Sequence, residues 1–228
     1  MHIQVSGRSF RLAIVAVSIL LAVAFAEAQD RTAAKDGAAP KIDAPGASYY
    51  LCLFSYETTP RRPQVAHSFA VFVKVEQQSL DVRTISWVPQ NNTIRLLRRT
   101  GDPGMNLDLQ HTLENARSLH ARIFSTGAYQ IKQELYDKAM QQIGKLACGQ
   151  VLYKVLDFND RPDRAVNCIH AISDIDTARG LLLVGTNYGR DASAMILEHL
   201  SPWIINRDKE HPWIIEKLGL AGSIAESK

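Results

Sequence analysis

The sequence predicts an α+β fold in which an antiparallel sheet packs against helices. Residues 49–56, 65–75 and 81–88 are rich in β-branched and aromatic residues, which is typical of strands, and a short polar turn joins the second run to the third. Residues 130–147 repeat apolar positions at spacings of three and four, which is typical of an amphipathic helix. The strands are grouped rather than alternating regularly with helices, and this grouping favours α+β.

The remaining elements are shorter and follow from turn residues and weaker apolar periodicity. Gly101 and Gly104 bound a predicted turn, because glycine is the commonest residue where the chain reverses. After this turn the expected order is a helix over 107–120, short strands at 121–124 and 151–155, a helix from 168 to about 178, and a last helix over 191–200.

The chain begins with the pattern of a secretory signal peptide. Arg8 and Arg11 form a basic start, residues 12–25 are apolar apart from one serine, and Ala26-Glu27-Ala28 has the small-x-small pattern of a cleavage site. The alternative is a membrane anchor, but a spanning helix needs roughly 20 apolar residues, and this run has 14. We therefore predict a signal peptide over 1–28 and a mature protein that is periplasmic or secreted, with no membrane span.

Cleavage before Gln29 leaves 200 residues, enough for one domain with a substantial core. Residues 29–47 are rich in Ala, Gly, Pro and charge and are predicted to be a flexible leader, followed by a single domain over 48–228. The removed part holds two basic and one acidic residue, so 26 basic and 23 acidic residues become 24 and 22, or +2. This balance does not predict nucleic acid or an anionic membrane as a partner, and nothing in the sequence indicates an oligomeric state.

Three cysteines remain in the predicted mature chain, namely Cys52, Cys148 and Cys168. Disulfides form in exported proteins, so an odd number leaves at least one thiol free or paired between chains. We expect any intramolecular bridge to join Cys52 and Cys148 and to leave Cys168 free. In the alternative, Cys52 and Cys148 are both buried and reduced.

Cys168 is the first candidate for a catalytic residue because it opens a predicted helix. Asn167 before it is a favourable N-cap, which places Cys168 in the first helical turn. Backbone N–H groups at a helix start stabilise a thiolate, and they can also stabilise an oxyanion on a carbonyl under attack. A buried structural cysteine explains this short motif equally well.

His67 is the second candidate, because it is the only histidine in a predicted core strand. A strand holds an imidazole rigidly, and a thiol nucleophile needs a base. The predicted strand places His67 on the same face as Phe69, Val71 and Val73. A lone histidine in this position is otherwise a core or edge residue without a catalytic role.

The order of these two motifs resembles that of the circularly permuted papain-like proteins, which include relatives of the NlpC peptidases and lecithin–retinol acyltransferase. A strand histidine in AHSFAVFVKV is followed 101 positions later by a helix-opening cysteine in NCIH, whereas ordinary papain-like enzymes have the cysteine first. The run Asn167-Cys168-Ile169-His170-Ala171 is similar to the acyltransferase signature Asn-Cys-x-His-Phe, with alanine in place of the aromatic residue.

The resemblance implies a circularly permuted papain-like fold with Cys168 as nucleophile and His67 as base and then acid. It also implies a third polar residue on the next strand that orients the imidazole, and Thr84 and Ser86 are the candidates there. An even number of residues in the hairpin loop puts both on the face of His67, with Ser86 nearer, and an odd number puts neither there. A hydroxyl is a weaker orienting group than the family's usual histidine or carboxamide.

These implications predict an exported hydrolase or acyltransferase that acts on an amide or ester through a thioester and needs no cofactor. Its substrate would be a peptide, muropeptide or lipid of the cell envelope. The alternative is a non-catalytic envelope-binding protein on the same fold. His170 stands two residues after Cys168, so we expect a structural hydrogen bond for it, and His111 and Glu114 lack a third partner for a metal.

Overall fold

The computed structural model describes residues 46–91, 93–95, 100–156, 165–180, 182–183, 185 and 187–225. The predicted signal peptide lies outside these residues, as does the predicted leader except for Gly46 and Ala47. Within the described ranges, no helix combines the length and the apolar character that crossing a membrane requires.

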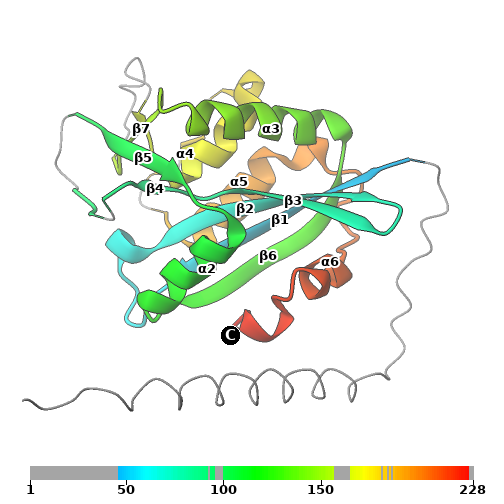
Figure 1. Ribbon diagram of the computed structural model, residues 1–228, viewed down its shortest axis with the longest axis horizontal. Coiled ribbons are helices and arrows are strands. Elements are labelled where there is room, and N and C mark those ends of the chain that lie inside the picture. Colours follow the sequence, from blue (N-terminus) through cyan, green and yellow to red (C-terminus); the bar gives the residue numbers. More distant parts are fainter. Residues whose placement is uncertain are drawn as a thin grey trace, which may run out of the picture. The chain divides into compact units, whose positions relative to one another are not determined.

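A four-stranded antiparallel sheet forms the centre of the domain (Figure 1). Its strands are apolar and β-branched, which suits a sheet that is covered on both faces. In spatial order the strands are β3 (Ser79–Ile85), β2 (His67–Glu76), β1 (Ser48–Glu57) and β6 (Arg122–Ile131).

Helices pack against both faces of this sheet (Figure 1). The helices α3 (Gln133–Ala147), α4 (Cys168–Ser173) and α5 (Arg190–His199) cover one face. The helices α2 (Leu109–Ser118) and α6 (Pro212–Lys217) cover the other. This arrangement confirms the predicted α+β class with an antiparallel sheet packed against helices.

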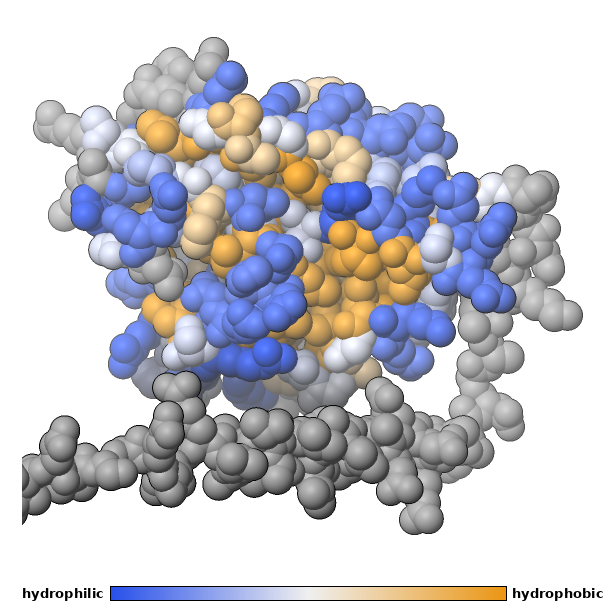
Figure 2. All heavy atoms as spheres, in the orientation of Figure 1, coloured by the Kyte–Doolittle hydropathy of each residue, from blue (hydrophilic) through white to orange (hydrophobic). Residues whose placement is uncertain are grey.

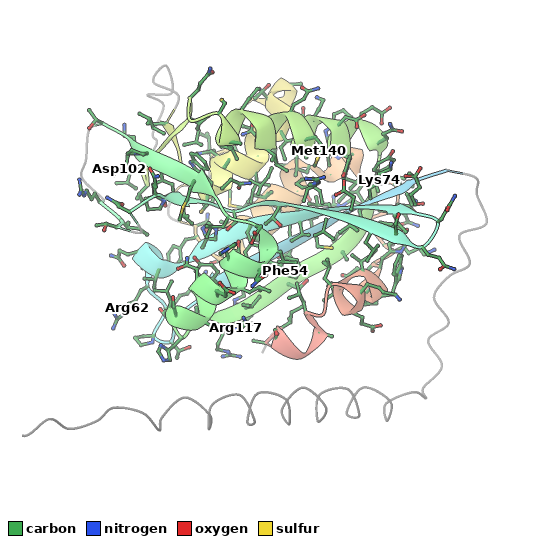
Figure 3. The ribbon with its side chains drawn as sticks, in the orientation of Figure 1. Phe54, Arg62, Lys74, Asp102, Arg117 and Met140 are labelled. Atoms are coloured by element: carbon green, nitrogen blue, oxygen red, sulfur yellow. The ribbon has the colours of Figure 1, made fainter. Side chains whose placement is uncertain are left out.

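Alternation along β2 separates two hydrophobic cores. Ala70 and Phe72 point to the core under α3, α4 and α5, whereas Phe69 and Val71 point to the core beside α2 and α6. Phe54 of β1, labelled in Figure 3, belongs to the second core. Figure 2 shows that apolar side chains also reach the surface of this second face, between α2 and α6.

A smaller sheet lies beside the main one, in the order β4 (Trp87–Pro89), β5 (Asp102–Asn106), β7 (Leu152–Tyr153) and β8 (Ala165–Val166). Its strands pair antiparallel except for β7 and β8. The predicted turn at 101–104 is therefore wrong, because most of it belongs to β5. Gly104 serves close packing in this strand, since a Cβ there would run into the ring of the buried Trp87.

Other elements differ from their predictions at the ends. The strand expected at 121–124 continues to Ile131 because Gly127, at a φ of 113°, lies at an irregularity in the pairing of β6 with β1. The helix that starts at Cys168 ends at Ser173, and the chain continues as a 3-10 helix. The 3-10 helices are η2 (Pro63–Val65), η4 (Asp174–Arg179), η5 (Ser201–Trp203) and η6 (Ala221–Ser223).

No disulfide joins Cys52, Cys148 and Cys168. Cys52 is fully buried in β1, and this burial raises the pKa of its thiol above the usual range. Cys148 follows α3 and is exposed, with its Sγ donating to the carbonyl of Lys145 at 3.0 Å. The expected Cys52–Cys148 bridge is therefore not formed, and only Cys52 matches the alternative of two buried thiols.

The buried carboxylate of Glu57 joins the end of β1 to the start of α5. Its Oε1 accepts from the backbone N–H of Arg190 at 2.7 Å, and its Oε2 lies 3.0 Å from Nε of Arg61. Arg61 in turn lies 2.8 Å from Asp191 on the same helix. Because Glu57 is only 4% exposed, its charge depends on these partners for compensation.

Candidate active site

His67 is the first residue of β2, at the end of the main sheet where the chain enters from η2. Tyr56 is its direct partner on β1, and the two ring centroids lie 5.0 Å apart. The ring of Phe69 stacks at 6.3 Å on the same face of the strand. These aromatic neighbours leave His67 only 5% exposed.

The hairpin between β2 and β3 has a two-residue loop, because Glu76 pairs with Ser79. This even loop places Thr84 opposite Val71 and turns the hydroxyl of Ser86 toward His67. Nε2 of His67 and Oγ of Ser86 share a hydrogen bond of 2.9 Å. Thr84 lies further along the sheet and lines a separate cavity with Asn106, so Ser86 is the residue that the structure brings to the histidine.

Ser86 occupies a break between β3 and β4, and the side chain of Asn106 spans this break. Nδ2 of Asn106 donates to the carbonyl of Thr84 at 2.8 Å, and its Oδ1 accepts from the N–H of Ser86 at 2.8 Å. The carbonyl of Ser86 accepts from the N–H of Leu107 at 2.9 Å. Asn106 thus holds Ser86 in place, and sequence reasoning missed it because Asn106 is distant in sequence and carries no motif.

Burial lowers the pKa of His67 to about 3. The charged imidazolium is disfavoured because the ring has exchanged water for aromatic neighbours. The hydrogen bond to Ser86 orients the ring without adding a charge. His67 is therefore a neutral imidazole near neutral pH and, at this pKa, a weak base.

Cys168 begins α4, and Asn167 caps this helix. Oδ1 of Asn167 accepts from the N–H groups of Ile169 and His170, each at 2.9 Å. Asn167 therefore occupies two of the N–H groups at this helix start, and the oxyanion site expected there stays a prediction. Cys168 itself is 8% exposed and packs in the core under α3 and α5.

Tyr56 connects the neighbourhoods of Cys168 and His67. Burial raises the pKa of Tyr56 above the usual range, and negative charge on Cys168 raises it further. Cys168 belongs to the core on one face of β2, whereas His67 lies on the other face, next to Phe69. The α4 helix, which Cys168 begins, contacts β2. The ring of Tyr56 lies beside that of His67, and the charge of Cys168 affects the pKa of Tyr56.

A cavity of about 190 Å³ opens beside His67. Tyr56 and Asn115 line it on one side, and Nδ2 of Asn115 donates to the hydroxyl oxygen of Tyr56 at 2.9 Å. Val88 and Tyr153 contribute from the smaller sheet. Sequence reasoning missed Tyr56 and Asn115, because the first looks like an ordinary strand aromatic and the second like an ordinary helical polar residue.

The other candidate residues have structural contacts. Nε2 of the buried His170 shares a hydrogen bond of 2.8 Å with the carbonyl of Leu182. Ala171, which stands where the acyltransferase signature has an aromatic residue, is fully buried and its carbonyl accepts from Nε2 of Gln142 at 3.0 Å. Among the described residues, no group of three or more His, Cys, Asp or Glu side chains could hold a metal ion.

Comparison with known proteins finds no matching family model, no matching curated protein and no matching solved structure.

Proposed function

We propose that this chain is an exported cysteine hydrolase or acyltransferase with a circularly permuted papain-like arrangement, in which Cys168 and His67 act on an amide or ester. The observation that carries this proposal is the imidazole of His67, anchored by Ser86 at 2.9 Å beside a cavity. The effect of Cys168 on the pKa of Tyr56, whose ring lies 5.0 Å from that of His67, is the observation that relates the sulfur to this end of the sheet.

The proposed reaction uses the neutral pair as its starting state. Sγ of Cys168 attacks the substrate carbonyl while His67 accepts the thiol proton, which forms a C–S bond and a tetrahedral intermediate. The intermediate collapses as the imidazolium returns this proton to the leaving amine or alcohol, and a thioester remains. Water or an acceptor alcohol or amine then attacks the thioester, His67 takes up its proton, and the thiol of Cys168 is restored.

The export of the protein is part of the proposal and follows from the N-terminal pattern that ends at Ala26-Glu27-Ala28. A cell-envelope location would give the enzyme peptides, muropeptides or lipids as substrates. N-terminal sequencing of exported protein should find Gln29 as the first residue. Full-length protein with an intact Met1 in the membrane fraction would contradict this part of the proposal.

Thiol labelling tests the catalytic pair without knowledge of the substrate. The experiment starts from Cys148→Ser, which removes the exposed thiol and leaves Cys168 and the fully buried Cys52. Iodoacetamide should alkylate Cys168 and spare Cys52, as read by mass spectrometry of the peptides. Adding His67→Ala should slow the labelling of Cys168 at least about a hundredfold, because the thiol loses its base.

A non-catalytic binding protein is the second candidate, favoured by the packing of Cys168 in a core and by the occupied N–H groups after it. Hydrolysis of p-nitrophenyl butyrate separates the two. The enzyme proposal requires that Cys168→Ala abolishes hydrolysis and that Cys52→Ala does not. Equal rates of hydrolysis for Cys168→Ala and the unmodified protein would favour the binding protein.

A further inference from the structure

The cavity beside His67 is lined without a charged side chain among the described residues. Val65, Val88 and Leu119 give it apolar walls, and its polar side chains are those of Tyr56, Gln64, His67, Asn115 and Tyr153. His67 does not add a positive charge, because burial lowers its pKa to about 3. A ligand carboxylate in this cavity would therefore lose water without gaining a cationic partner among these residues, which is unfavourable.

The size of the cavity limits what it can hold. Its volume is about 190 Å³, and a cavity of roughly 150 Å³ with apolar walls accommodates one benzene molecule. A group the size of one aliphatic or aromatic side chain fits this space. A long acyl chain does not fit within the described walls.

Tyr56 supplies a hydrogen-bond donor in this cavity. Its oxygen already accepts from Nδ2 of Asn115, and no described residue accepts the proton of its hydroxyl. Tyr56 is 3% exposed, so the position of this proton is set by packing rather than by water. The raised pKa of Tyr56 keeps the phenol protonated near neutral pH, and a carbonyl oxygen is the group that such a donor would bind.

Resting on the proposed function, we infer that this cavity binds the acyl part of the substrate as an uncharged, mainly apolar group no larger than a single side chain, with Tyr56 donating to its carbonyl oxygen. This inference narrows the range of cell-envelope substrates that the proposed enzyme would accept. It favours short acyl groups and small apolar amides over muropeptide groups that carry a carboxylate and over long lipid chains.

Binding tests this inference without catalysis. Butyramide and succinamate have acyl chains of the same length, and only succinamate carries a carboxylate at the end of the chain. Heteronuclear NMR titration of the full chain carrying Cys168→Ala should give at least about tenfold tighter binding for butyramide, because the carboxylate remains unpaired. Equal affinities, or no binding of butyramide in the millimolar range, would overturn the inference.

Two substitutions test whether the ligand binds in this cavity and whether Tyr56 donates a hydrogen bond to it. Val65→Phe in η2 reduces the space in the cavity and should weaken butyramide binding at least about tenfold, whereas Arg62→Phe just before η2 should not. Arg62 is exposed, does not line the cavity, and is labelled in Figure 3. Tyr56→Phe should weaken binding about fivefold through the lost hydrogen bond. Equal effects of Val65→Phe and Arg62→Phe would place the ligand elsewhere.

Acylation separates this inference from the proposed function. With p-nitrophenyl butyrate, mass spectrometry should detect a butyryl thioester on Cys168. If butyramide binds as expected but no thioester or hydrolysis appears, the cavity is a binding site and the enzyme proposal fails. If Cys168 is acylated equally fast by p-nitrophenyl butyrate and by the mono-p-nitrophenyl ester of succinate, the enzyme proposal stands and the inference about the cavity fails.

Discussion

The imidazole of His67 and the hydroxyl of Ser86 are joined by a hydrogen bond of 2.9 Å across the break between β3 and β4. A two-residue hairpin loop sets the register that makes this contact possible, and the side chain of Asn106 bonds to the N–H of Ser86 and to the carbonyl of Thr84. Ser86 is therefore the orienting partner of the histidine, and Thr84 is not.

Replacing Ser86 with alanine should lower kcat for p-nitrophenyl butyrate about tenfold and leave KM unchanged, because the imidazole loses the hydrogen bond that orients it. Thr84→Val is the matched control, since it removes a neighbouring hydroxyl of the same hairpin that does not reach His67, and it should leave kcat unchanged. A larger loss of kcat in Thr84→Val than in Ser86→Ala would reverse the assignment. NMR of the His67 ring nitrogens should change in Ser86→Ala alone.

Stability should depend on pH through His67. Its pKa is about 3 in the folded protein against 6.5 as the ordinary value, so the unfolded chain binds a proton first as the pH falls. The contribution of the neutral ring is complete above pH 6.5 and is lost progressively as the pH falls toward 3, with a slope of about 1.4 kcal/mol per pH unit.

Urea denaturation at several pH values measures this effect. Between pH 7 and pH 4.5, the unmodified protein should lose about 2–3 kcal/mol more unfolding free energy than His67→Gln, which has no ring to protonate. His120→Asn replaces an exposed histidine at a φ of 51°, a conformation that asparagine tolerates, and should keep the slope of the unmodified protein. Parallel curves for His67→Gln and the unmodified protein would mean that His67 is not the titrating group.

Glu57→Gln should destabilise the domain by about 1–2 kcal/mol, because Arg61 and Arg190 lose the charge of their buried partner and the bonds to it weaken. Glu198→Gln is the control, as Glu198 pairs with Arg207 at 2.6 Å but both side chains are at least half exposed. Water solvates that pair in either state, so its loss should not change the unfolding free energy measurably. Equal urea midpoints for the two variants would contradict a supporting role for Glu57.

Gly104→Ala should destabilise the domain by about 1–3 kcal/mol, because the new Cβ meets the ring of Trp87, which is fully buried and cannot move aside. Gly144→Ala provides the opposite case. Gly144 lies inside α3 with no neighbouring atom near its Cβ position, so alanine should stabilise the helix by about 0.5–1 kcal/mol. Thermal or urea unfolding should therefore move in opposite directions for the two glycines.

The amino-acid sequence by itself determined the elements whose signals are local. Three features could be predicted because each depends on residues that are close in the sequence. They are the apolar runs of β1 and β2, the periodicity of α3 and the position of Asn167 before Cys168. The even hairpin loop was one of two open alternatives, since one residue more or less reverses the face of every side chain on β3.

Only the tertiary structure decided the features that depend on distant residues. Gly104 is part of a strand because Trp87 packs on it, β6 passes through Gly127 because β1 pairs along its whole length, and the N–H groups after Cys168 are occupied by Asn167. Asn106 and Tyr56 carry no local motif, because their importance lies in contacts with residues from other strands and helices. Packing and hydrogen bonding between such segments arise only when the chain is folded, so no local pattern encodes them.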